Sequence, residues 1–413
     1  MHVYRDRRHR ILWGRSRASL IRAGVTLLLV LLALLLTVLL IARLRQGGGP
    51  SRPAATVAPT AIPTVEPTPA PTPTPVPTPT PSVLDLTPTV VERPSFNIDS
   101  REALIDLYWW LIYSGESTVQ LEALSLPESE LIEVTDKFSN YFDAFTYTLD
   151  PPSMHFVLKP GVKVLTALQR GDWDSLNSEE QLIADMAQEI VTETLHYGMS
   201  DLEKELALHD YIAEHCEYLL QDEFIHTEDA RGFFQYGRCQ CAGYVDTFRL
   251  LGRLAGLEIE MIGGPTTRDL AGTKGHAWNL IRLDGRWYVA DLTWDDMIAG
   301  TGAVEHTFFN LPPASFGNTR SWDQTCCPDG AYATALDEKY YYYRQEYVVT
   351  SKETALASAI RQLDAGGTAY ICFREGDYIQ EVAAELQNHY PSGGTCTELS
   401  RDLNFSLYKF TLR

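Results

Sequence analysis

The stretch HAWNLIRLDGRWYVADLTWDD, residues 276–296, constrains the fold of this chain more than any other part. Two strand-like runs flank Asp284 and Gly285, and an Asp-Gly pair in this setting favours a two-residue type I′ hairpin turn. Such a turn places Leu283 opposite Arg286. The pairing of every residue further along the two strands follows from that first pair.

This register brings a histidine and an aspartate close together. Counting outward from the turn, Trp278 faces Asp291 and His276 faces Thr293. Because side chains alternate between the two faces of a strand, His276 and Asp291 project from the same face as a diagonal pair, about 7–8 Å apart between backbones. A slip of one residue would put them on opposite faces, so the prediction can fail.

A cysteine precedes a predicted helix in RCQCAGYVDTF, residues 238–248. An apolar stripe at helical spacing follows Cys241 and stops near Gly256. A helix N-terminus and a nearby imidazolium both lower the pKa of a thiol, and an acceptor on the far side of the imidazole orients the ring. The sequence supplies each part of such a set: Cys241 at a helix start, His276 on a strand, and Asp291 beside His276 on the same face.

Two longer segments, CAGYVDTFRLLGRLAGLEIEMIGG and GHAWNLIRLDGRWYVADLTWDD, resemble the transglutaminase-like superfamily of papain-like cysteine enzymes. The shared pattern is Cys-x-Gly-Tyr before a helix, His-x-Trp-Asn on a strand, and Trp-Tyr-x-x-Asp-x-Thr-Trp on the next strand. The resemblance covers roughly residues 185–312. It implies an α+β fold in which the helix bearing Cys241 packs on an antiparallel sheet. It also implies acyl transfer or hydrolysis at a peptide, isopeptide or glutamine amide through a thioester. By position in the shared pattern, Cys241 would be the nucleophile, His276 the general base and acid, and Asp291 the orienting carboxylate.

Other residues near these motifs have more than one interpretation. The negative oxygen formed during acyl transfer needs hydrogen-bond donors, and the backbone N–H of Cys241 is the first candidate. The side chain of Gln235 is a further candidate, against a solvated loop residue. Trp278 is either a packing residue or a wall of the site. Asp295 and Asp296 favour a solvated loop over a calcium site, and we expect neither a metal nor another cofactor.

The seven cysteines are an odd number, so at least one has no partner within the chain. Cys216 falls on the apolar face of a predicted helix and is either a buried thiol or half of a disulfide. Cys239 is a disulfide partner, a spectator, or a redox partner of Cys241. A bridge between Cys372 and Cys396 is one possibility. A zinc clip is disfavoured, because no second Cys/His pair at zinc spacing lies nearby.

Residues 23–42 form an uncharged apolar run long enough, at about 1.5 Å per residue, to cross a layer of about 30 Å. A cleaved signal peptide would have a shorter apolar region. Seven arginines precede the run and two follow it closely, which predicts that residues 1–22 lie in the cytoplasm and the rest of the chain outside. We expect a single-pass cell-membrane protein.

The rest of the chain divides by composition. Residues 43–95 are a Pro/Thr-rich linker that favours extended polyproline II. We expect a mainly helical region at 96–184, the transglutaminase-like core at 185–344 and a small α/β module at 345–413. Within the net charge of −20, the first 45 residues carry +8 and the remainder −28, which argues against a nucleic-acid partner.

The expected function is that of an extracellular thiol enzyme acting on a protein or peptide substrate, in the cell wall or on surface proteins of a bacterium with a thick wall. The wall is inferred from location alone. A binding or scaffold module on the same fold, without catalysis, is the alternative. The sequence makes no prediction of oligomeric state.

Overall fold

The computed structural model describes most of the chain after the proline-rich segment: residues 82–149, 152–219, 226–267, 275–299, 304–311, 316–317, 319–327, 339–344, 347–374, 376–401 and 406–413. Helices and sheets alternate in these residues, so the class is α+β, as expected. In this part of the chain, no helix is both long and apolar enough to span a bilayer. The segment predicted to do so, 23–42, lies outside the described residues.

The first described part combines two helices with small sheets. Helix α2 begins after Ser100, whose hydroxyl accepts a hydrogen bond from the N–H of Ala103. Its buried face contributes to a hydrophobic cluster with α3 and a sheet of order β2-β5-β4. The elements are β1 (Asn97–Ile98), α2 (Arg101–Ser114), β2 (Thr118–Gln120), β3 (Ala123–Leu124), α3 (Glu128–Phe138), β4 (Phe142–Leu149) and β5 (Pro152–Leu158).

Three helices then lead into the core. Ser200 and Glu203 form a capping box at the start of α6. All three helices share a hydrophobic cluster with α7. The expected boundary between residues 184 and 185 falls inside α5, because that helix buries side chains along its whole length against the core. The helices are α4 (Pro160–Arg170), α5 (Ser178–Thr194) and α6 (Asp201–His215).

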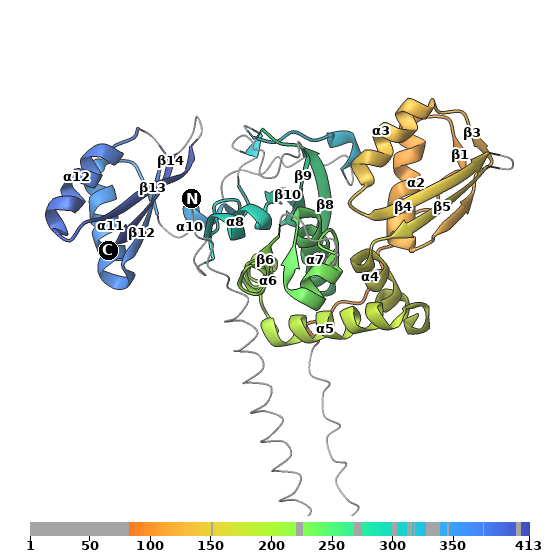
Figure 1. Ribbon diagram of the computed structural model, residues 1–413, viewed down its shortest axis with the longest axis horizontal. Coiled ribbons are helices and arrows are strands. Elements are labelled where there is room, and N and C mark those ends of the chain that lie inside the picture. The colour runs from red at the N-terminus through yellow and green to blue at the C-terminus, as the bar shows by residue number, and fades with distance from the viewer. Residues whose placement is uncertain are drawn as a thin grey trace, which may run out of the picture. The chain divides into compact units, whose positions relative to one another are not determined.

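In the core, helix α7 (Cys241–Leu254) lies against an antiparallel sheet of order β10-β9-β8 (Figure 1). The strands are β8 (Glu258–Pro265), β9 (Gly275–Leu283) and β10 (Arg286–Ala290). The apolar stripe of α7 is fully buried in the contact. This is the helix-on-sheet arrangement that the sequence predicts.

The β9–β10 hairpin has the predicted register near its turn. Leu283 pairs with Arg286, and Asp284 and Gly285 have φ values of 49° and 77°, as a type I′ turn requires. The predicted pair of His276 with Thr293 does not form, because β10 ends at Ala290 and Thr293 lies in helix α8 (Leu292–Ala299). On its other side His276 pairs with Gly264 of β8.

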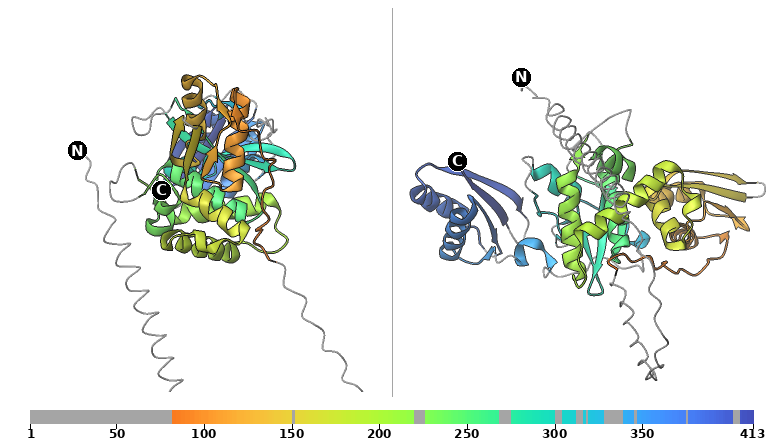
Figure 2. Two further views of the ribbon diagram at one scale, coloured as in Figure 1. Left: turned by 90° about the vertical axis from the view of Figure 1, so that its right-hand side faces the viewer. Right: turned by 90° about the horizontal axis from the view of Figure 1, so that it is seen from below.

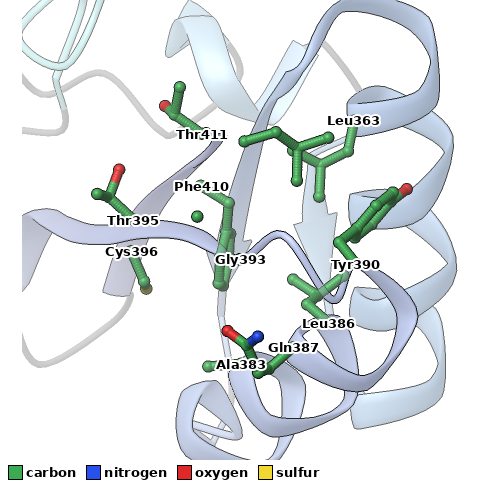
Figure 3. Close-up of a pocket in the computed structure, with 12 residues that line it drawn as sticks. Leu363, Ala383, Leu386, Gln387, Tyr390, Gly393, Thr395, Cys396, Phe410 and Thr411 are labelled. Atoms are coloured by element: carbon green, nitrogen blue, oxygen red, sulfur yellow. The ribbon is translucent and has the colours of Figure 1, made fainter.

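The module after residue 345 has a four-stranded sheet of order β11-β12-β14-β13, with helices α11 and α12 on one face (Figure 2). A pocket of about 130 Å³ lies beside α12 and is lined by Leu386, Tyr390, Cys396 and Phe410, among others (Figure 3). The elements are β11 (Val348–Val349), α11 (Lys352–Gly366), β12 (Thr368–Phe373), α12 (Ile379–His389), β13 (Gly394–Arg401) and β14 (Ser406–Leu412).

Short elements connect these parts. They are η1 (Trp173–Ser175), β6 (Glu217–Tyr218), the π-helical turn η2 (Gly232–Tyr236), β7 (Arg238–Cys239), η3 (Gln324–Cys326) and α10 (Tyr341–Arg344).

The end of the predicted linker contacts the core. Val83 and Leu84 pack against the cluster that contains α7, and the N–H of Asp85 donates to the carbonyl of Leu254 at 2.7 Å. The extended spacer expected over 43–95 is therefore already in contact with the folded body at residue 83.

All seven cysteines are free. The thiols of Cys216 and Cys239 are buried and hydrogen-bond to each other, so Cys239 has a thiol neighbour other than Cys241. A bridge between Cys372 and Cys396 is not formed, because their strands, β12 and β13, lie on opposite sides of β14.

Candidate active site

Cys241 is the first residue of α7 and is half-buried. The start of the helix contacts Thr227, because the N–H of Gln240 donates to the Thr227 carbonyl at 2.7 Å. A Cβ added at Gly243 would lie 2.4 Å from that same carbonyl oxygen and 2.8 Å from the sulfur of Cys239. The glycine of Cys-Ala-Gly-Tyr is thus needed for the close approach that places Cys241.

His276 connects the thiol to a carboxylate. Its Nε2 donates to Oδ2 of Asp291 at 2.8 Å, and its ring hydrogen-bonds to the Cys241 thiol, which leaves Nδ1 for the sulfur. His276 is 8% exposed and Asp291 is fully buried. The structure thus brings the three residues predicted from the motifs into one hydrogen-bonded line, which we call the Cys241–His276–Asp291 cluster.

The surroundings favour the protonated imidazole. Burial lowers the pKa of His276, but the charge of Asp291 and hydrogen bonds to Asp291 and Cys241 outweigh it and raise the pKa to about 9. Burial likewise raises the pKa of Asp291, and the positive charges of His276 and Arg320 reverse this, so the pKa lies below its ordinary value.

Asp291 is held from several sides. Its N–H donates to the Phe308 carbonyl at 3.1 Å, and its Oδ1 accepts the N–H of Trp294 at 3.2 Å. The guanidinium of Arg320 donates to Oδ2, the oxygen that also accepts from His276. The carboxylate therefore has a defined orientation.

Arg320 was not predicted from the sequence. It lies 29 residues after Asp291, outside the motifs, and no spacing rule connects the two. Only the folded chain brings them together.

Tyr218 was also missed. It lies on β6, which pairs with β7 just before Cys241. Burial first, and then the negative charges of Cys241 and Asp291, raise the pKa of Tyr218 to about 12. Its hydroxyl therefore lies near the cluster in its protonated, hydrogen-donating form.

Two other predicted residues have different roles. The amide of Gln235 donates to Glu179 at 2.5 Å, so this contact competes with a role as a donor at Cys241. Trp278 is fully buried, with its ring 6.0 Å from that of His276 and packed on Phe316 and Trp322. Trp278 therefore packs beside the histidine ring.

The expectation of a solvated loop at Asp295 and Asp296 is wrong. Both belong to α8; Asp295 is fully buried and Asp296 is half-buried. Asp295 accepts from the N–H of Phe308 at 2.8 Å and contacts His209 at 3.1 Å, whereas Asp296 accepts from the hydroxyl of Tyr244. The pair therefore orders the start of α8, directly after Asp291.

One group of residues in the described part could hold a metal by distance alone. The side-chain donor atoms of His209, Asp210 and His306 lie within 4.8 Å of one another. Asp210 lies 3.0 Å from His209 and 2.7 Å from His306, and the far nitrogen of His209 contacts Asp295. These hydrogen bonds account for the arrangement without an ion.

A partly buried thiol at a helix start, bonded to an imidazole that a buried carboxylate orients, is an arrangement found in cysteine-dependent acyl-transfer and hydrolytic enzymes. Comparison with known proteins agrees: residues 186–292 match the family model described as the transglutaminase-like superfamily. This part of the chain is a transglutaminase-like domain. Members of that family are generally cysteine enzymes, either transglutaminases or peptidases.

Two curated relatives are similar over the same part of the chain. The kyphoscoliosis peptidase of Mus musculus is 25% identical over 197 residues, and that of Homo sapiens is 28% identical over 195 residues. Each match covers 42% of this chain and 30% of the relative. The chain thus spans under a third of the length of these relatives.

A solved structure, described as the crystal structure of a TGase, matches at 19% identity and a TM-score of 0.24. It covers 34% of this chain and 40% of its own. At that TM-score the match carries no weight for function.

Proposed function

We propose that this protein is a thiol enzyme that transfers or hydrolyses acyl groups at an amide through Cys241, His276 and Asp291. The Cys241 thiolate attacks the amide carbonyl carbon, and the carbonyl electron pair moves onto oxygen. His276, as imidazolium, then gives its proton to the departing nitrogen while the C–N bond breaks. The products are a thioester on Cys241 and a free amine or ammonia.

The second step regenerates the thiol. An amine or a water molecule attacks the thioester while the neutral His276 takes its proton, and the sulfur leaves as thiolate. An amine yields a crosslink and water yields hydrolysis. The backbone N–H of Cys241, at the start of α7, is the candidate donor to the negative oxygen of both intermediates.

The observation that carries the proposal is the His276 ring, which bonds to the half-exposed Cys241 on one side and to the buried Asp291 on the other. A scaffold that does no chemistry has no need for a buried, charged pair next to a thiol residue that is only partly buried. The relatives named as peptidases favour amide chemistry.

The location remains a proposal from sequence. The apolar run at 23–42 and the proline-rich linker support a body anchored at the cell membrane and exposed outside the cell. There a protein or peptide of the cell wall or surface would be the substrate. A non-catalytic binding module is the second candidate, favoured only if Cys241 proves unreactive.

Thiol labelling tests the proposal directly. We expect iodoacetamide near neutral pH to modify Cys241 at least about tenfold faster than a simple cysteine peptide, because the imidazolium favours the thiolate. His276→Ala should remove this advantage, and peptide mapping by mass spectrometry identifies the modified residue. If Cys241 in the folded protein reacts no faster than the peptide, the scaffold function holds instead.

A further inference from the structure

A second cation meets the carboxylate of Asp291. Arg320 and Asp291 form an ion pair in which both side chains have 0% exposure. Removing either partner of such a buried pair leaves an uncompensated charge, so the arrangement persists only if both are present. Asp291 belongs to the residues that match the family model, 186–292, whereas Arg320 lies outside them.

The backbone around Arg320 is attached to the sheet next to His276. Arg320 forms a β-bridge with Thr266, directly after β8. The N–H of Thr267 donates to the carbonyl of Thr319 at 2.8 Å, and that of Ser321 donates to the carbonyl of Pro265 at 3.1 Å. Residues 319–321 thus pair alongside residues 265–267, at the end of β8, through backbone hydrogen bonds.

This attachment depends on a glycine. Gly264 pairs with His276 across β8 and β9, and a Cβ added at Gly264 would lie 2.1 Å from the carbonyl oxygen of Ser321. A contact that short with backbone cannot be relieved by a side-chain rotation. Gly264 therefore permits the close approach that brings the arginine to the cluster.

Aromatic rings hold the guanidinium. Its central carbon lies 4.2 Å from the ring centroid of Trp294, 4.8 Å from that of Phe308 and 4.5 Å from that of Phe316. A planar guanidinium stacks well on such rings, whereas the ammonium of lysine is a point charge on a flexible chain. The rings fix Arg320 in the orientation that meets Asp291.

We propose that Arg320 is a positioning residue for the Cys241–His276–Asp291 cluster, which holds the Asp291 carboxylate in place and offsets part of its negative charge. The inference rests on the proposed function and adds a residue to it. His276 and Arg320 donate to the same oxygen, Oδ2, while the N–H of Trp294 holds Oδ1. Both oxygens of the carboxylate are thereby occupied.

The chemical effect follows from the charges around His276. Cys241 on α7 and Asp291 after β10 favour the imidazolium, and Tyr218 on β6 and Asp295 on α8 lie near Asp291. Among these groups Arg320 is the permanent cation beside the carboxylate. Because Arg320 offsets part of the negative charge of Asp291, the imidazolium of His276 is stabilised less and gives its proton to the leaving nitrogen more readily.

The test measures the rate of iodoacetamide alkylation at Cys241 as a function of pH, together with the NMR titration of the His276 ring. Arg320→Met fills the space between the aromatic rings without the charge. We expect the His276 titration and the alkaline limb of the alkylation profile to move up by about one pH unit. Arg320→Lys, which keeps the charge but not the stacking on the rings, should shift the profile clearly less than Arg320→Met.

Identical alkaline limbs for the wild type and a folded Arg320→Met would overturn the proposal. A limb in Arg320→Lys shifted as far as in Arg320→Met would also overturn it, because the charge would then not be responsible. Folding is checked by near-UV circular dichroism. If Arg320→Met does not fold, Gly264→Ala is the second variant, because it displaces residues 319–321 without changing the arginine. It should shift the alkaline side of the alkylation profile in the same direction. An unshifted profile in Gly264→Ala refutes the positioning role of Arg320.

Arg253→Met is the matched control. This arginine also pairs with a buried carboxylate, Glu260, and lies 5.4 Å from the ring centroid of Tyr113, but at the other end of α7. We expect it to lower stability and leave the pH profile unchanged. If wild-type Cys241 reacts only as fast as a cysteine peptide, the proposed function fails, while the NMR titration of His276 still decides the role of Arg320.

Discussion

The two ends of helix α7 each adjoin a buried carboxylate, and the two centres differ in the partners of that carboxylate. Glu260 is fully buried beyond the C-terminal end. It accepts from Arg249 at 2.8 Å, from the hydroxyls of Tyr113 and Tyr141 at 2.7 and 2.9 Å, and from Arg253. Two permanent cations and two hydroxyls occupy its oxygens. This centre joins α2 and the segment before β4 to the core.

At the N-terminal end, Asp291 has one permanent cation, Arg320, and one partner that titrates, His276. His276 in turn contacts a half-exposed thiol. The comparison shows that buried ion pairs do not by themselves indicate a catalytic site. What distinguishes the Asp291 centre is a partner that titrates, His276, and a partly buried thiol beside it.

The largest expected effect concerns the sulfur. Cys241→Ser should lower amide turnover by about 10⁴-fold or more, since a hydroxyl is a far weaker nucleophile than a thiolate at the same place. Trapping of an acyl-enzyme with an activated acyl donor, followed by mass spectrometry, measures the loss. Cys239→Ser is the matched control and should retain trapping; equal loss in both variants would contradict the assignment of Cys241.

The Glu260 centre should respond in stability and not in reactivity. Glu260→Gln leaves two buried guanidinium groups short of a charge partner and should lower the free energy of unfolding by about 3 kcal/mol or more. Urea denaturation measures this. The relative alkylation rate of Cys241 should stay within about twofold of the wild type, and a large drop in the folded variant would show that the two centres are coupled.

The two centres should also stabilise the fold over opposite pH ranges. Burial raises the pKa of Glu260, but Arg249 and Arg253 lower it to about 2, from an ordinary value of 4.5. Its stabilising effect is complete above pH 4.5 and is lost as the pH falls towards about 2. His276 has a raised pKa of about 9, so its effect is complete below 6.5 and is lost as the pH rises towards 9.

Unfolding free energies measured from pH 2 to pH 10 check this division. Glu260→Gln should flatten the acid side of the profile, and His276→Ala should flatten the alkaline side. An alkaline side that is unchanged in His276→Ala would mean that His276 is not charged in the folded protein.

The smallest effect is expected at Gly243. An added Cβ would meet the Thr227 carbonyl oxygen at 2.4 Å, so Gly243→Ala should cost about 1–3 kcal/mol and shift the start of α7. Thermal unfolding measures the cost. Gly285→Ala, at the exposed turn, serves as the comparison, because there the added Cβ causes strain at a positive φ and no clash. Unchanged stability and an unchanged alkylation rate in Gly243→Ala would show that the start of α7 can shift without cost.

The parts of the site that depend on local geometry could be predicted from sequence. Asp284 and Gly285 determine the turn, the turn determines the register, and the register brings His276 close to Asp291. The helix start at Cys241 follows from its apolar stripe. Each of these inferences needs only periodicity and turn chemistry.

The parts that depend on tertiary packing could not be predicted. Arg320 reaches Asp291 through a segment that pairs with the residues after β8. Thr293 and Asp295, expected in a strand and a loop, lie in α8 because β10 ends at Ala290. The contact of Gln235 with Glu179 joins residues 56 positions apart. Long-range pairs of this kind leave no spacing pattern in the chain.

The contact of Asp85 with Leu254 lies at the far end of the helix that carries Cys241. The polypeptide arrives at the C-terminal end of a 14-residue helix whose first residue is Cys241, about 20 Å away. Residues 83–85 therefore contact the core at the end of α7 remote from the sulfur. Changes in this contact and changes at the thiol can thus be made at opposite ends of one helix.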